Sequence, residues 1–116
     1  MAAPERLPDG VRTVLEDAAT RLLVSAATAW EMAIKHHAGK WPEAEPLIQR
    51  HADFVARLGA ASLDITAEHA IRAGGLGWGH RDPFDRMLAA QALNHPARLV
   101  TGDTAFTQLP GLDVFW

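Results

Sequence analysis

The order of apolar and polar positions along the chain follows two periods, which predict short strands separated by helices. The run RLLVSA at 21–26 is apolar and short, which is typical of a buried strand. In the segment 47–58, apolar side chains fall on one stripe of a helix that Gly59 ends. Asp82 followed by Pro83 has the pattern of a helix start. The full pattern predicts helices over 11–20, 28–38, 47–58, 66–73 and 83–93, a helical turn over 104–108, and strands over 21–26, 61–65, 98–101 and 112–116.

Short apolar strands that alternate with helices indicate an α/β fold, in which a small parallel sheet carries helices on both faces. No repeat, low-complexity tract or linker interrupts the chain. We therefore expect residues 1–116 to form a single domain. In such a sheet the functional crevice lies beyond the carboxyl ends of the strands, so candidate chemistry is sought there.

Composition narrows the classes of function. The 116 residues are 48% hydrophobic, enough for one core, and include no cysteine, which excludes disulfides, thiolate catalysis and thiolate zinc sites. No apolar run approaches the roughly 20 residues that cross a bilayer, and the N-terminus has no signal-peptide pattern. We therefore expect a cytoplasmic protein with no membrane partner. A net charge of −3 does not decide whether nucleic acid is bound, because carboxylates that hold cations make a nuclease acidic.

Three acidic residues, Glu31, Asp85 and Asp103, stand near or just after the ends of predicted strands. Each also fits a capping role. Glu31 lies three residues after Thr28, and Asp85 three residues after Asp82, in capping-box patterns. Asp103 is placed to cap the turn that follows it. Three carboxylates that converge on one crevice would repel one another unless a cation lay between them, so capping and metal binding both stay open.

The chemistry that three such acids support is phosphodiester hydrolysis with Mg²⁺ or Mn²⁺, because hard cations take carboxylate oxygens. No phosphate-binding glycine loop, nucleophile elbow, zinc-protease helix or dinucleotide-binding fingerprint occurs in the sequence. The histidines predict no further metal site. His36 and His37 are adjacent and point to different sides of a helix, while His69 and His95 have the pattern of surface positions.

Three segments, VSAATAWEMAIKHHAGKW, HRDPFDRMLAAQAL and LVTGDTAF, closely resemble the signature regions of VapC-like PIN-domain toxins in residue type, order and separation. The similarity extends from about Pro4 to Trp116, and HRDPFDRMLAAQAL is its most specific part. The resemblance implies a PIN-like three-layer α/β/α fold. It also implies the toxin of a type II toxin-antitoxin system, a Mg²⁺-dependent endoribonuclease that is usually a homodimer and is neutralised by a cognate antitoxin.

The resemblance also implies roles for individual residues. Glu31 matches the helix glutamate of the family's WExxIK segment, Asp85 the third acid in DPFDR, and Asp103 the acid after the strand LVT. These three are the implied catalytic residues and ligands of Mg²⁺ or Mn²⁺. Ser25 and Thr101 match small hydroxyl positions near the metal site.

Two arginines of the most specific segment are candidates for contact with RNA. Arg81 and Arg86 both lie in HRDPFDR, where a guanidinium could reach a phosphate. For Arg86 we expect a surface salt bridge in preference to RNA contact.

The chain departs from the family pattern at its N-terminus. Family members begin with a strand that ends in an aspartate and with a helix, before the region that matches PERLPDGVRTVLEDA. We expect this first, central strand to be absent and the single PIN-like domain to be N-terminally truncated. Asp9 and Asp17 do not follow a predicted strand, so neither replaces the missing carboxylate. Loss of one ligand predicts weaker metal binding and impaired turnover.

Three interpretations stay open. The first is an active ribonuclease whose natural start lies upstream of Met1. The second is a catalytically inactive, truncated relative that only binds an antitoxin or dimerises. The third is an α/β binding module whose acids are all caps and which binds no divalent cation.

Overall fold

The computed structural model describes residues 7–116, which form two compact units. Arg21–Thr66 make up the first, here called the central unit. Helix α1 (Asp9–Glu16) and Ala67–Trp116 belong to the second, here called the terminal unit. Each unit contains one two-stranded parallel sheet and its own helices. No helix within residues 7–116 is long and apolar enough to span a membrane.

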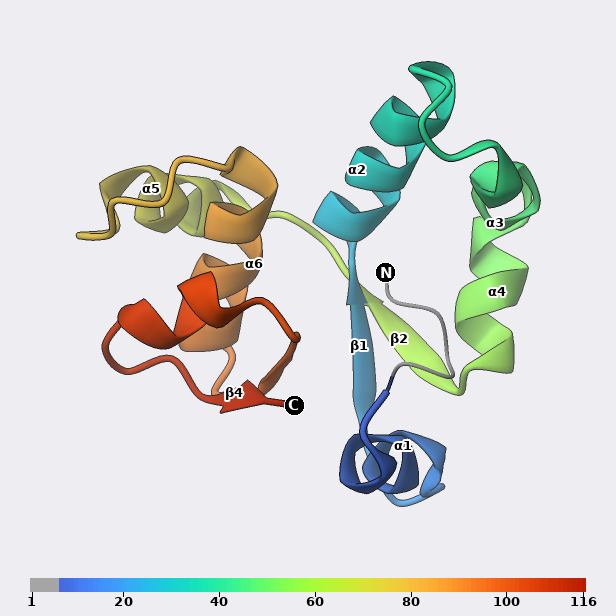
Figure 1. The fold of residues 1–116 in the computed structure, drawn as a ribbon, viewed down its shortest axis with the longest axis horizontal. Coiled ribbons are helices and arrows are strands. Elements are labelled where there is room, and N and C mark those ends of the chain that lie inside the picture. The colour runs from blue at the N-terminus through green and yellow to red at the C-terminus, as the bar shows by residue number, and fades with distance from the viewer. Residues whose placement is uncertain (1–6) are drawn as a thin grey trace. The chain divides into compact units, whose positions relative to one another are not determined.

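The central unit is a strand–helix–strand arrangement with parallel strands. Strand β1 pairs with β2 over four residues, from Leu22 opposite Ala60 to Ser25 opposite Leu63. Parallel pairing needs a long crossover, and helices supply it here, as the colour order of Figure 1 shows. The elements in order are β1 (Leu22–Ser25), α2 (Ala26–His37), the 3₁₀ helix η2 (Pro42–Ala44), α3 (Glu45–Gln49), α4 (His51–Arg57) and β2 (Ala60–Leu63).

Local signals in the sequence place the ends of helix α2. The Ser25 side chain accepts a hydrogen bond from the Ala27 N–H at 3.0 Å, so Ser25 is the N-cap. After the helix, Gly39 takes a φ of +76°, and the Lys40 N–H bonds back to the Lys35 carbonyl. The buried apolar side chains of this unit are small or medium in size: Ala27, Met32, Ala44 and Val55.

The helix predicted over 47–58 is interrupted. Helix α3 ends at Gln49 and α4 begins at His51, because Arg50 leaves the helical region with φ −118° and ψ 39°. The Phe54 N–H then bonds to the Arg50 carbonyl at 2.9 Å and starts the new helix. A break of one residue hardly disturbs the apolar stripe, which is why periodicity alone predicted one helix.

The terminal unit contains α5 (Ala67–Gly75) packed against α6 (Pro83–Asn94), followed by a second small sheet (Figure 1). Strand β3 (Leu99–Val100) pairs in parallel with β4 (Val114–Phe115), with Leu99 opposite Val114. The 3₁₀ helix η3 (Thr104–Gln108) lies between these strands in the sequence. The predicted α/β class and the parallel pairing are confirmed, but the strands belong to two separate pairs.

A cluster of buried side chains joins the helices of the terminal unit to its sheet. Ala89 of α6, Phe106 of η3 and Leu109 form its centre. Ala89, Ala90 and Gln91 are buried, so two small side chains and one amide lie on the buried side of α6 over this turn. Six partly buried residues complete the cluster: Leu76, Trp78, Leu93, Leu99, Leu112 and Val114.

Candidate functional site

Asp85 occupies the first turn of α6, and the sequence before it dictates where that turn begins. Pro83 stands at the first helical position, and the Asp82 carboxylate accepts from the Phe84 N–H at 2.9 Å and the Asp85 N–H at 3.2 Å. The predicted cap is confirmed. The backbone of Asp85 is therefore held at the start of α6 by the Asp82 cap.

The Asp85 side chain is paired with a histidine from the preceding loop. The His80 Nε2 lies 2.7 Å from the Asp85 Oδ2. Both side chains are partly exposed, His80 at 29% and Asp85 at 20%. The other oxygen, Oδ1, accepts no hydrogen bond from the described residues. A capping box would have turned the Asp85 carboxylate back toward the backbone of Asp82; its partner is instead the imidazole.

Arg86 ties the same loop to α6. Its guanidinium donates to backbone carbonyls at 2.9 Å (Ala73), 2.7 Å (Trp78), 2.9 Å (His80) and 2.9 Å (Leu76), with a longer contact of 3.5 Å to a fifth, Gly74. The surface salt bridge expected for Arg86 is therefore wrong, because its donors face backbone carbonyls at the end of α5 and in the loop after it. An arginine with its donors so engaged has none to offer an RNA phosphate, unlike the exposed Arg81 next to the helix.

Asp103 follows β3 and caps η3. Its Oδ1 accepts from the Ala105 N–H at 2.9 Å, so the predicted cap is confirmed. Thr101 supports it, because the Thr101 hydroxyl accepts from the Asp103 N–H at 3.1 Å. Between them, Gly102 lies under the Trp116 indole so closely that a Cβ there would come within 2.8 Å of the ring. The Asp103 side chain is exposed to solvent.

Glu31 lies in the central unit, in the middle of α2. Its Oε2 is 3.4 Å from the Lys35 Nζ, one turn further along the helix. The capping box predicted for Thr28 and Glu31 is wrong, because α2 begins at Ala26 and Ser25 is its cap. Capping therefore does not account for Glu31, while it accounts for Ser25, which is buried.

The candidate acids differ in what surrounds them. Asp85 and Asp103 belong to the terminal unit and Glu31 to the central unit. Among residues 7–116, no three histidine, aspartate or glutamate side chains gather into a group that could hold a metal ion. The donors themselves suit Mg²⁺ or Mn²⁺, since all three are carboxylates with solvent access.

Two histidine contacts escaped the sequence analysis. The surface position predicted for His69 is wrong: it is 3% exposed, and its Nε2 lies 2.9 Å from the Nε2 of His95. The second is His80, five residues before Asp85 but across a helix start. The hydrophobic periodicity of the sequence could not predict the His80–Asp85 contact, because the contact depends on the path of an irregular loop.

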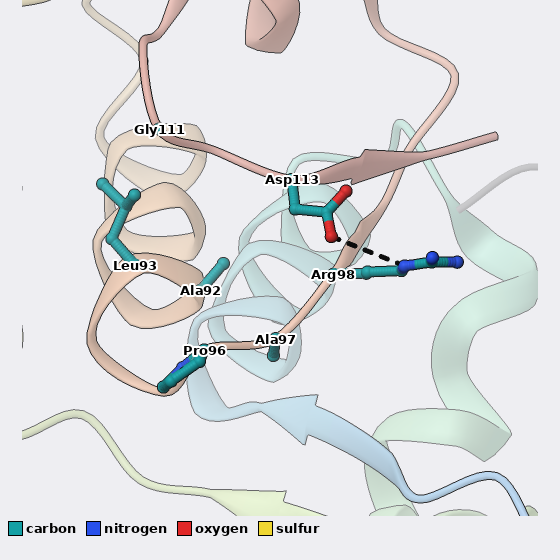
Figure 2. Close-up of a pocket in the computed structure, with 7 residues that line it drawn as sticks. All are labelled: Ala92, Leu93, Pro96, Ala97, Arg98, Gly111 and Asp113. Carbon is teal, nitrogen blue, oxygen red and sulfur yellow. Dashed lines mark ion pairs between the residues drawn. The ribbon is translucent and has the colours of Figure 1, made fainter.

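One further hollow lies apart from these acids in the terminal unit. A pocket of about 440 Å³ is bounded by the end of α6, the start of β3 and the segment before β4 (Figure 2). At its rim Arg98 pairs with Asp113 at 3.5 Å, and both side chains are largely exposed. No candidate acid lines this pocket.

Comparison with known proteins identifies the same family that the motifs resemble. The sequence model of the PIN domain matches residues 1–112. A stretch of 58 residues is 36% identical to ribonuclease VapC16 of Mycobacterium tuberculosis, covering 50% of this chain and 41% of that protein. The chain thus matches less than half the length of this relative. No solved structure matches the chain.

Proposed function

The chain belongs to the PIN-domain family, and from that membership we propose that it is the ribonuclease domain of a VapC-like toxin of a type II toxin-antitoxin system. The reaction is metal-dependent hydrolysis of RNA phosphodiester bonds. The observation that carries the proposal is Asp85: a carboxylate at a helix start, with one oxygen fixed by His80 and the other able to accept a ligand. Three observations support the same proposal: membership of the PIN-domain family, similarity to a ribonuclease, and the Asp85 carboxylate with one oxygen held by His80.

The metal is Mg²⁺ or Mn²⁺, and the residues that would hold it are Glu31, Asp85 and Asp103. A bound divalent cation activates water and offsets the negative charge that gathers on the phosphate. Asp103 keeps its second oxygen for this purpose, because only Oδ1 is used in capping. Ser25 and Thr101 hold the backbone at β1–α2 and β3–η3, and so act on the acids indirectly.

RNA binding is assigned to Arg81 in this proposal. Its side chain is exposed, it lies next to the Asp82 cap, and it is four residues before Asp85. A guanidinium there would hold a phosphate close to Asp85. Arg86 has no part in RNA binding in this proposal, because carbonyls of α5 and of the loop after it take up its donors.

The remaining partners follow from the same membership. We propose a cognate antitoxin and a second copy of the chain as protein partners, and a cytoplasmic location. The chain acts as one PIN-like domain in this proposal.

A second function has its own observation in favour. Because no group of three metal-binding side chains is gathered within residues 7–116, the domain would bind cations weakly and could serve only to bind an antitoxin or to dimerise. Cleavage of RNA separates this alternative from an active ribonuclease.

The test is incubation of the purified chain with mixed RNA and Mg²⁺ or Mn²⁺, with EDTA and the variant Asp85→Asn as controls. Asp53→Asn is a matched control, since Asp53 is an exposed carboxylate on α4. We expect cleavage that needs the cation, that disappears with Asp85→Asn and that persists in Asp53→Asn. A folded protein that cuts no RNA with either cation would contradict the ribonuclease proposal and favour the inactive relative.

A further inference from the structure

Beyond the acids, we infer that His80 is a positioning residue for Asp85 and that Arg86 acts through His80, so that the segment 73–80, the end of α5 and the loop after it, supports the metal site from outside. This inference rests on the proposed function, because it assigns roles toward the cation that Asp85 would bind. Neither His80 nor Arg86 would touch the metal or RNA. Their effect is on how well Asp85 is oriented before the cation arrives.

Arg86 is connected to the loop by hydrogen bonds from its guanidinium to backbone carbonyls. A guanidinium carries five N–H donors in a rigid fork. Here they meet carbonyls of Ala73, Leu76, Trp78 and His80 at 2.7–2.9 Å, with Gly74 at the longer 3.5 Å. Hydrogen bonds to a charged donor are about twice as strong as neutral ones. Lysine has three donors on a flexible stem and could not satisfy this set.

The second step is the loop's dependence on that connection. The loop 76–82 contains two glycines, Gly77 and Gly79, at which the backbone has little conformational preference of its own. Between the end of α5 and the start of α6, the described backbone–backbone contact is one short bond, from the Trp78 N–H to the Leu76 carbonyl. Arg86 holds three carbonyls of this loop, while the side chains of Leu76 and Trp78 pack against the core cluster.

The third step is the fixing of the His80 ring. Its backbone carbonyl is held by Arg86 at 2.9 Å, and its ring lies 4.8 Å from the Trp78 ring and 6.4 Å from the Phe106 ring, measured between centroids. Phe106 is a core residue, 3% exposed. The imidazole is thus held from its backbone and from its faces, and its Nε2 points at Asp85.

The fourth step is the consequence for Asp85. A hydrogen bond at Oδ2 limits rotation of the carboxylate and leaves Oδ1 for a cation. Outer partners of this kind typically change metal affinity or activity by about 10- to 100-fold. A hydrogen bond that only stabilised the fold predicts something different, since its loss would lower the free energy of unfolding without a specific effect on metal affinity. Metal affinity and folding stability should therefore respond differently when His80 changes.

The experiment is calorimetric titration of the chain with MnCl₂ in the absence of RNA. Glutamine places an N–H donor near the position of the histidine Nε2, whereas asparagine is too short to reach it. We expect His80→Asn to weaken Mn²⁺ binding by about 10- to 100-fold, and His80→Gln to stay close to the unchanged chain. His37→Ala, an exposed histidine on α2, is the matched control and should bind normally.

Arg86→Lys tests the second half of the inference. It should also weaken Mn²⁺ binding, and the double variant with His80→Asn should bind no more weakly than His80→Asn alone, because the two act in series. If the unchanged chain binds Mn²⁺ but His80→Asn binds it equally well, the inference is wrong and the proposed function stands. If the unchanged chain binds no Mn²⁺, the proposed function fails first. Additive losses would show that Arg86 does not act through His80.

Discussion

Asp82 and Asp103 show, at the scale of the residue, that a carboxylate can cap a helix and still offer an oxygen to another ligand. Asp103 uses Oδ1 for the Ala105 N–H and leaves Oδ2 without a hydrogen bond among the described residues. Asp82 uses a single oxygen for two N–H groups of α6. Capping and metal binding, which the sequence presents as alternatives, are therefore compatible at Asp103.

Asp103→Asn separates the two roles. Asparagine is as good an N-cap as aspartate, so unfolding free energy should change by less than about 0.5 kcal/mol, whereas Asp103→Ala should cost about 1 kcal/mol. Cleavage of RNA should fall by more than about 100-fold in both, beyond the loss typical of outer partners. Urea denaturation and a cleavage assay check these values. Normal cleavage by Asp103→Asn would remove Asp103 from the site.

At the scale of the element, helix ends depend on single residues whose roles are readable from their type. Helix α4 ends at Arg57, Leu58 is its C-cap, and Gly59 follows with a φ of +66°. A side chain in this left-handed region is strained even though a Cβ would meet nothing within 4 Å. Gly10, in the first turn of α1, lacks this requirement and has open space around it.

Alanine at these two glycines should therefore act in opposite directions. Gly59→Ala should destabilise the protein by about 1–2 kcal/mol, because its backbone would have to hold a left-handed conformation. Gly10→Ala should be neutral or stabilise by up to about 1 kcal/mol, because alanine is the better helix residue. Thermal unfolding of both variants measures the difference. Equal shifts would mean that Gly59 is not needed for the turn.

At the scale of the whole molecule, the fold class predicted from the sequence is confirmed, since the PIN domain is a three-layer α/β/α fold and both sheets are parallel. Buried apolar side chains occur in both compact units. In the terminal unit a buried cluster forms around Phe106, and in the central unit the buried apolar side chains are Ala27, Met32, Ala44 and Val55. With small buried side chains in both, each large one matters for stability.

Phe106→Ala should be among the most destabilising single substitutions. Removal of a buried phenylalanine typically costs about 3–5 kcal/mol, a large part of the roughly 5–15 kcal/mol that a domain has. Leu58→Ala, at a residue 46% exposed, is the control and should cost much less. Urea denaturation followed by circular dichroism measures both. A loss below about 1 kcal/mol at Phe106 would contradict its central place in the core.

The features that the sequence alone determined are those that depend on interactions between residues close together in the chain. The start of α6 at Asp82 and Pro83, the turn over 104–108 and the alternation of strands with helices depend on neighbours within a few residues, so residue type and spacing reveal them. The family followed for the same reason, because its motifs are local strings. The roles of Glu31, Asp85 and Asp103 as metal ligands stay predictions.

The tertiary structure decided which groups meet across loops and between elements. Three contacts depend on the path of a glycine-rich segment and on the packing of α5 against α6: the His80–Asp85 pair, the contacts of Arg86 with the segment 73–80, and the contact of the buried His69 with His95. Polar contacts of this kind have no sequence period, since the partners are brought together by the fold and not by spacing. A break such as the one at Arg50 is hidden for a related reason: it changes one backbone conformation and leaves the apolar stripe intact.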